Sequence, residues 1–302
     1  MATPAPGQRH WRNIVYFGVL HALPLGALVT GADRDVFIAA AVLYVVRIWF
    51  VTAGYHSYFS HRAFRTSRAF QLVLAVGAQT SAQGSVLAWA ATHRHHHGHA
   101  DEAEDLHSPV RRGLWYAHIG WLLRTDYLAR SRARTGPFTD VPELVWLDRH
   151  PHVAPLCLAA ALVAAYGWPG LFIGYGLGTV AVYHATFTVN SLAHRFGSRP
   201  YRTADHSRNN WFVALIMLGG GWHNNHHRHP RSARHGVRWW ELDAGYAVLV
   251  VLGWLGLVWD LRVPRPQSVN ESVNESVNEW VGDAAVSAEV APRRPERSHR
   301  PC

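Results

Sequence analysis

The feature that most constrains this chain is a set of four apolar stretches arranged as two closely spaced pairs. They cover residues 14–30, 36–54, 152–168 and 171–190. A helix that crosses a bilayer needs about 20 largely apolar residues, and the link within each pair is long enough only for a tight turn. A signal peptide at 14–30 is disfavoured because a second apolar stretch follows at once. We therefore predict an all-α integral membrane protein with four transmembrane helices in two hairpins.

The arginines indicate how these hairpins are oriented. The chain contains no lysine, and within the two hairpin turns only Arg34 is basic. The N-terminus, residues 61–150 and the chain after His194 are rich in arginine. Because cytoplasmic loops carry the excess of positive charge, we expect both termini on the cytoplasmic side of the cell membrane. Nucleic-acid binding is disfavoured, since the basic residues alternate with the spans and form no groove-reading motif.

The sequence divides into a membrane domain and a tail. We expect the domain over residues 1–263, with the polar segments outside the spans forming a cytoplasmic helical cap. The apolar stretch 70–91 is interrupted by a polar run, so we predict that it lies at the membrane interface or is buried in protein. The tail, 264–302, holds three tandem copies of SVNE and has little to bury, which predicts disorder.

Three histidine clusters lie on the predicted cytoplasmic side. The first is the H-x4-H pair His56 and His61, where the second span ends. The third, GGGWHNNHH, has the spacing H-x2-H-H. The second cluster is THRHHHGH, residues 92–99. When the H-x2-H-H spacing is applied to it, the spacing selects one histidine and the pair of histidines that begins three residues later. The residues selected in these two clusters are His93, His96, His97, His223, His226 and His227.

These spacings predict metal ligands. On a helix, positions i, i+3 and i+4 share one face, so three imidazoles of a cluster can point at one centre while His95 and His99 point away. Eight imidazoles exceed the needs of one ion and suit two ions with four or five ligands each. Imidazole favours iron, copper, zinc or nickel over calcium or magnesium. The two cysteines cannot supply a four-thiolate iron–sulfur or zinc site.

The remaining histidines have no such pattern. His107 stands near Asp101 and Asp105 and either helps to orient ligand imidazoles through hydrogen bonds or is simply solvated. The others are expected to be structural or solvated: His10, His21, His118, His150, His152, His184, His206, His229, His235 and His299.

The order of the clusters resembles that of the membrane fatty acid desaturases, in particular the stearoyl-CoA (acyl-CoA Δ9) desaturase-like branch. The matching stretches are TAGYHSYFSHRAF, WAATHRHHHGHADEAEDLHSPVRRGLWYAHIGW, NSLAHRFGSRPY, GGGWHNNHH and GVRWWELD. The resemblance implies a non-haem centre of two ferrous ions held by nine histidines. It adds His194 as the ninth ligand and Asn190 as a polar neighbour that reaches the metal through water. One iron would take His56, His61, His93, His97 and His226, and the other would take His96, His194, His223 and His227.

The resemblance also implies a reaction. An unactivated methylene has no acidic proton and no leaving group, so the oxidation relies on a metal cofactor and O2 while the protein positions the chain. We expect a cis double bond, at Δ9, in a fatty acyl chain carried by CoA. A separate donor, a ferredoxin, a cytochrome b5-like protein or a flavoprotein reductase, is expected to supply two electrons. A group of arginines either forms a docking surface for that donor or for CoA phosphates, or anchors the chain against anionic lipid. These are Arg111, Arg112, Arg130, Arg132 and Arg134.

Two other functions compete with this interpretation. A di-iron hydroxylase of alkyl chains, sterols or carotenoids would use similar clusters, but NSLAHRFGSRPY and GVRWWELD favour a desaturase. A metal-transporting membrane protein would place ionisable residues along a path through its spans. The spans carry almost none beyond His21, Arg47 and His184, which disfavours transport.

Overall fold

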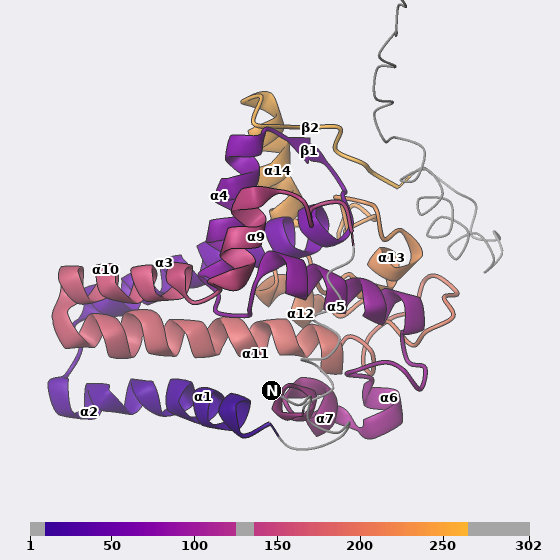
Figure 1. Cartoon of the computed structure of the whole chain (residues 1–302). Coiled ribbons are helices and arrows are strands. Elements are labelled where there is room, and N and C mark those ends of the chain that lie inside the picture. The colour runs from indigo at the N-terminus through magenta and orange to yellow at the C-terminus, as the bar shows by residue number, and fades with distance from the viewer. Residues whose placement is uncertain (1–9, 125–135, 265–302) are drawn as a thin grey trace, which may run out of the picture.

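The structure, a computed structural model, describes residues 10–124 and 136–264 and is mostly helical (Figure 1). Two short strands, β1 (Arg65–Thr66) and β2 (Val258–Trp259), pair antiparallel. The helices are α1 (Trp11–Ala22), η1 (Leu23–Gly26), α2 (Ala27–Thr30), α3 (Arg34–Trp49), η2 (Phe50–Ser60), α4 (Arg68–Gln79), α5 (Val86–His99), α6 (Pro109–Arg112), α7 (Leu114–His118), η3 (Gly120–Leu123), α9 (Pro142–Arg149), α10 (Val153–Pro169), η4 (Gly170–Leu177), α11 (Gly178–Ser191), α12 (Trp211–Ile216), α13 (His223–Arg228) and α14 (Ala244–Trp254).

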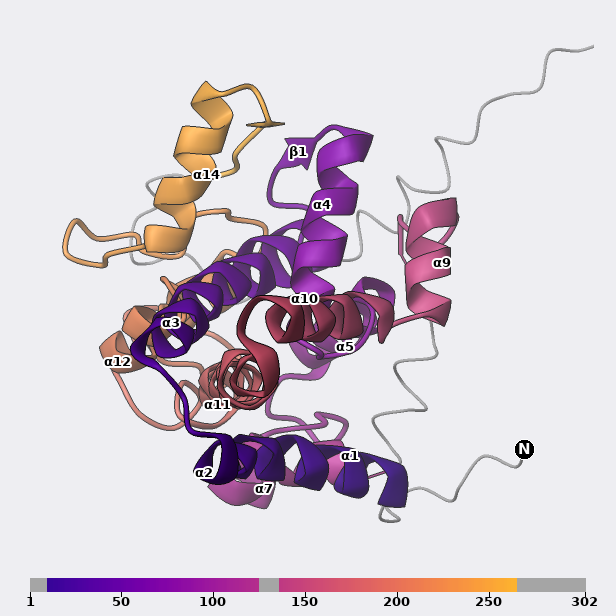
Figure 2. The ribbon, with the colours of Figure 1, turned by 90° about the vertical axis from the view of Figure 1, so that its left-hand side faces the viewer.

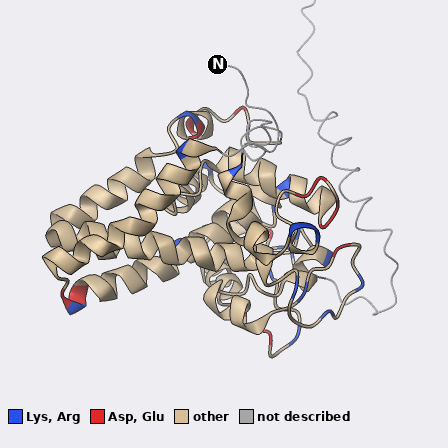
Figure 3. Ribbon diagram, turned by 90° about the horizontal axis from the view of Figure 1, so that it is seen from below, with Lys and Arg blue, Asp and Glu red and all other residues tan. Residues whose placement is uncertain are grey.

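Within the described residues, three helical segments are long and apolar enough to cross a membrane. They are Trp11–Thr30, Arg34–Ser60 and Val153–Ser191. Figure 3 shows that the long helices are almost free of charged residues except at one tip, whereas charges gather at the opposite end of the molecule. This segregation is that of a membrane protein, because unpaired charges are costly in the bilayer core.

The third segment reverses direction in its middle. Gly167 has φ 64° and ψ −150°, a backbone conformation that a residue with a side chain rarely adopts. The two arms then pack closely, since a Cβ on Gly170 would lie 2.0 Å from the carbonyl oxygen of Leu162. As a result, α10 packs against η4, and the chain continues from η4 into α11 (Figure 1).

A helical cap covers one end of the long helices. In Figures 1 and 2, α4 and α14 run across the direction of the long helices. The predicted interruption of the 70–91 stretch is present, because α4 ends at Gln79 and α5 begins at Val86. One side of α4 buries Leu74 and Ala78, and the other exposes Val73. Such a helix, apolar on both sides and lying across the long helices, is suited to a membrane interface.

A chain of three imidazoles joins α1, α7 and α11. The Nε2 atoms of His21 and His184 lie 3.1 Å apart, and His184 Nδ1 lies 3.0 Å from His118 Nε2. His118 Nδ1 is 3.0 Å from the hydroxyl of Ser191. These histidines carry no ligand spacing in the sequence, and the structure gives them interhelical hydrogen bonds.

Candidate metal centre

The last turns of the second long helix have π-helical winding, which brings His56 and His61 together. The N–H of His61 donates to the carbonyl oxygen of His56 at 3.2 Å, a bond across five residues. An α-helix would turn these two side chains apart, whereas the wider π turn returns to the same face after about five residues. Their ring centroids are 4.8 Å apart.

Ordinary helical turns position six of the other histidines. His93, His96 and His97 share a face of α5, which Ser85 caps by accepting a hydrogen bond from the N–H of Ala88. The short helix α13 carries the matching trio from the third cluster, His223, His226 and His227. The ninth histidine, His194, follows the end of α11.

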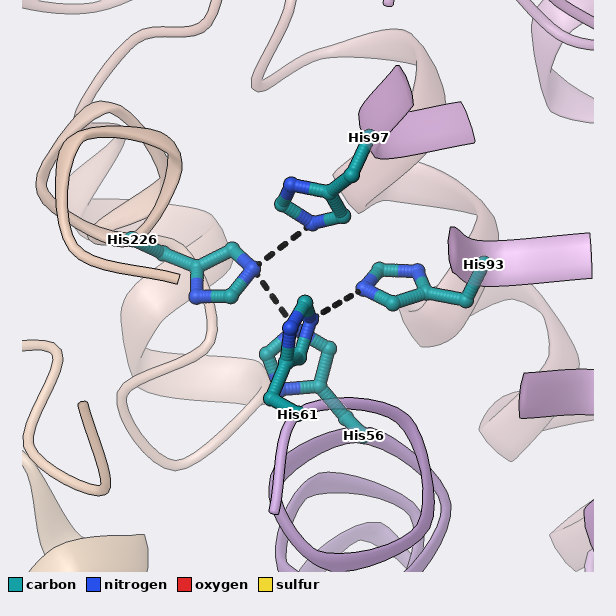
Figure 4. A group of neighbouring side chains, drawn as sticks. All are labelled: His56, His61, His93, His97 and His226. Carbon is teal, nitrogen blue, oxygen red and sulfur yellow. Dashed lines mark hydrogen bonds between the residues drawn. The ribbon is translucent and has the colours of Figure 1, made fainter. Parts of the chain in front are cut away.

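Five of these side chains form one group, called here the five-histidine group (Figure 4). One ring nitrogen of each member lies within 4.8 Å of those of the others. The Nε2 atoms of His56 and His97 lie 3.0 and 2.9 Å from Nε2 of His226. The members are His56, His61, His93, His97 and His226.

The other four form the four-histidine group, with ring nitrogens again within 4.8 Å of one another. His194 Nε2 and His223 Nε2 are 3.0 Å apart. Its members are His96, His194, His223 and His227, and all four are buried. The two groups have the same members as the two ligand sets that the resemblance implies.

Both groups have the chemistry that a metal ion requires. A ligand imidazole must be neutral, and burial lowers the pKa of His93, His223 and His226 well below 6.5, because desolvation disfavours the charged ring. In the four-histidine group, Nε2 of His96 and Nε2 of His227 are buried without a hydrogen-bond partner. Buried polar atoms normally have a partner, and a metal ion would supply it.

Three buried carboxylates hold the four-histidine group from behind. Asp105 lies 3.1 Å from Nδ1 of His96, and Asp101 lies 3.0 Å from Nδ1 of His194. Burial opposes ionisation of Asp105, yet electrostatic attraction to the rings of His96 and His107 and the hydrogen bonds that Asp105 accepts hold its pKa below the ordinary range. The third carboxylate was not expected from the sequence.

That third carboxylate is Asp205, whose Oδ2 lies 2.7 Å from Nδ1 of His227. It follows NSLAHRFGSRPY in a loop, at no fixed spacing from any histidine cluster, so pattern reasoning had no signal for it. A hydrogen bond donated by the imidazole N–H to such a carboxylate fixes the tautomer of a ligand imidazole and makes its other nitrogen a stronger ligand to metal.

The remaining candidate residues fall close to the centre or away from it. The His107 ring lies 4.4 Å from that of His96, and burial lowers the pKa of His107 to about 3. Asn190 and His107 line the adjoining cavity. His95 and His99 belong to neither group, and each contacts a backbone carbonyl instead. Arg111 and Arg112 end α6, whereas Arg130, Arg132 and Arg134 lie outside the described residues.

A buried amide network fixes α13. The Asn209 amide donates to Oδ1 of Asn225 at 2.7 Å, and the Asn225 amide donates to Glu241 at 2.8 Å. Glu241, from the stretch GVRWWELD, also accepts from the backbone N–H groups of Val237 and Arg238. Satisfied networks of this kind specify one arrangement of a buried site.

A cavity of 610 Å³ opens beside the metal-ligand candidates. His93 and Asn190 line it together with the aromatic rings of Phe17, Tyr183 and Phe187. At its wall, Gln83 donates to the Thr186 hydroxyl at 2.9 Å and accepts from Trp89 Nε1 at 3.3 Å, and Trp89 stacks on His93. Its mainly apolar lining with a few fixed polar groups suits a small apolar substrate.

Comparison with known families decides the identity. The family model for fatty acid desaturases matches residues 35–259, which include all nine histidines. The chain belongs to the fatty acid desaturase family. This membership confirms the resemblance seen in the sequence, and this desaturase is accordingly an oxidoreductase that acts on fatty acyl chains.

Curated relatives of the desaturase differ in substrate. An acyl-CoA C20 Delta5-desaturase of Anemone leveillei is 34% identical over 83% of this chain and 81% of its own length. An sn-1 stearoyl-lipid 9-desaturase of Anabaena variabilis is 34% identical over 87% of this chain and 97% of its own. A palmitoyl-monogalactosyldiacylglycerol delta-7 desaturase of Arabidopsis thaliana is 34% identical over 85% of this chain and 71% of its own.

Proposed function

We propose that the two histidine groups hold two iron ions and that this centre, with O2, introduces a cis double bond at Δ9 of a fatty acyl chain. The observation that carries the proposal is the convergence of nine imidazoles from four separate segments into two compact groups beside an apolar cavity. When bound, the iron pair supplies with O2 the oxidising power needed to remove hydrogen from an unactivated methylene.

The side chains of the desaturase position the substrate. The volume of the cavity is within the range of small-molecule binding sites. His93 lies both in the wall of the cavity and in the five-histidine group. An acyl chain in this cavity would run past Asn190, which lies in the cavity wall. We propose that the Asn190 side chain reaches the metal through a water molecule. The Gln83–Thr186 hydrogen bond, tied to Trp89, fixes the wall beside His93 and thereby the carbon that faces the centre.

The acyl carrier is proposed to be CoA, with a lipid-linked chain as the second candidate. The acyl-CoA desaturase of Anemone supports the first, and the stearoyl-lipid desaturase of Anabaena, matched over nearly its whole length, supports the second. Purified protein assayed separately with stearoyl-CoA and with stearoyl lipid in vesicles distinguishes them, and mass spectrometry locates the new double bond.

We also propose four spans with both termini and the metal centre in the cytoplasm. The reversal at Gly167 divides the 39-residue segment into two antiparallel arms, which supports a second hairpin. The concentration of charge at the cap end supports the orientation (Figure 3). An external protein donor would supply the electrons, and the basic residues Arg111 and Arg112 are exposed for docking it.

The central experiment compares substitution of a histidine that belongs to a metal-ligand group with substitution of a histidine that belongs to neither group. His226→Ala removes a member of the five-histidine group, whereas His95→Ala changes a histidine of the second cluster that belongs to neither group. We expect unsaturated product and two iron ions per chain in the wild type and in His95→Ala. In His226→Ala we expect no unsaturated product and loss of the iron ion of the five-histidine group. Product from His226→Ala at the wild-type level contradicts the proposal, and an alcohol as the sole product indicates a hydroxylase.

A further inference from the structure

The two histidine groups differ in what lies behind their rings. In the four-histidine group, three of the four imidazoles have the nitrogen that points away from the centre bonded to a carboxylate. The pairs and their distances are His96–Asp105 at 3.1 Å, His194–Asp101 at 3.0 Å and His227–Asp205 at 2.7 Å.

These carboxylates are built into the fold as anions. They are 9% exposed or less, and each accepts further hydrogen bonds from fixed donors. Asp105 accepts from the N–H groups of Asp101 and His107. Asp101 accepts from the Ser108 hydroxyl, and Asp205 accepts from the N–H of Ser207. Donors of this kind stabilise a buried negative charge and keep it in one position.

The five-histidine group has a different environment. The Nδ1 atoms of His56 and His226, which are directed away from the shared centre, are buried and make no hydrogen bond. Next to both stands the buried ring of His235, with centroid distances of 5.1 and 4.9 Å. His235 Nε2 is likewise buried without a partner. An imidazole therefore stands here where carboxylates stand behind the other group.

Packing holds His235 in this place. Its backbone N–H donates to Oδ2 of Asp243 at 2.7 Å, and its carbonyl oxygen accepts from the Asn225 amide at 2.9 Å. Asn225 belongs to α13, the helix that carries His226. The ring of His235 is thus tied to the helix that carries His226 and lies close to His56 and His226.

We propose that the two groups are unequal metal sites: the carboxylate-backed four-histidine group binds a divalent ion more tightly and fills first, and the five-histidine group, which has the His235 ring behind it instead of carboxylates, binds more weakly. This inference rests on the proposed metal centre. Three anions attract a dication and strengthen the donor nitrogens of their imidazoles, and outer partners of this kind contribute about 10- to 100-fold to metal affinity each. The outer nitrogens of His56 and His226 have no carboxylate bonded to them, so their group gains no comparable attraction.

Titration of metal-free protein in detergent with Co2+ tests the inference, with binding followed by calorimetry and by the visible Co2+ spectrum. We expect two separate binding steps of one equivalent each. Asp205→Asn keeps the size of the side chain and removes its charge, so it should weaken the first step by about 10- to 100-fold and leave the second within about 3-fold. The control His235→Gln, which changes the residue behind the other group, should leave the first step unchanged.

Ligand deletions identify the two steps. His223→Ala should abolish the first step, and His226→Ala should abolish the second. If Asp205→Asn does not fold, as judged by size-exclusion chromatography, Asp105→Asn is the second variant with the same expected result. Two steps of equal affinity, or loss of the first step in His226→Ala, overturn the inference. Absence of any Co2+ binding by folded wild-type protein instead contradicts the proposed metal centre itself.

Discussion

The backbone N–H of His61 donates to the carbonyl oxygen of His56, five residues earlier, at 3.2 Å. This π-helical bond gives the H-x4-H spacing a structural reason, because only a turn wider than that of an α-helix returns to the same face after five residues. The extra residue in the turn is therefore part of the site, in keeping with the tendency of π turns to occur at functional positions.

Adding one residue to this turn should separate the two imidazoles. Insertion of an alanine between Ser57 and Tyr58 leaves five residues between the histidines, and in a helix that turns by about 100° per residue the sixth position lies on a different face. We expect at least one metal ion per chain to be lost, with metal content measured by mass spectrometry. Ser57→Ala keeps the spacing and serves as the control. Full metal content in the insertion variant would show that the spacing of His56 and His61 is dispensable.

The wall of the cavity should influence where the double bond is placed. Thr186→Val is nearly isosteric but removes the hydroxyl that accepts from Gln83, which leaves the half-buried Gln83 amide without this partner. A typical hydrogen bond contributes about 0.5 to 1.5 kcal/mol, and we expect a several-fold lower kcat/KM and a broader distribution of double-bond positions. Thr186→Ser retains the hydroxyl and should behave as wild type. An unchanged product distribution in Thr186→Val would show that the Gln83–Thr186 hydrogen bond does not control where the double bond is placed.

Metal-free protein should lose stability in acid, in part through His107. Burial lowers the pKa of His107 to about 3, below the 6.5 of an unfolded histidine. Between these values the unfolded chain binds a proton that the folded chain does not, so acidification favours unfolding. The loss begins as the pH falls through 6.5 and costs about 1.4 kcal/mol per pH unit. His107→Phe cannot titrate, so its thermal midpoint should fall less between pH 7 and pH 5; an equal fall in both proteins contradicts this role.

The imidazole chain should hold α1 against the rest of the molecule. His184→Phe removes the hydrogen bonds to His21 and His118 while keeping an aromatic ring. Loss of two interhelical hydrogen bonds should destabilise the protein by about 1 to 3 kcal/mol, seen as a lower thermal midpoint in detergent and faster proteolysis near α1. The control is His150→Ala, which changes an exposed histidine that is not part of the imidazole chain. Equal midpoints for wild type and His184→Phe would mean that packing alone holds α1.

Local patterns in the sequence are sufficient for part of this structure. The apolar stretches predict helices of membrane-spanning length, and three such segments are present among the described residues. The spacing i, i+3, i+4 is a property of any α-helix, so His93, His96 and His97 could be predicted to share a face, with His95 outside it. The tail after residue 264 lies outside the described residues, and its disorder stays a prediction.

The helical segments and the histidines that can face one way follow from the sequence alone, because helical periodicity and hydrophobicity act over a few neighbouring residues. The family resemblance already implied which histidines share a group, whereas only the folded chain shows that Asp205 and His235 stand behind different groups. These contacts join residues distant along the chain, such as His56 and His235, and they depend on how α13 and the loops pack. The spacing of a local motif carries no information on that packing, so the different charge behind the two groups becomes visible only in the folded chain.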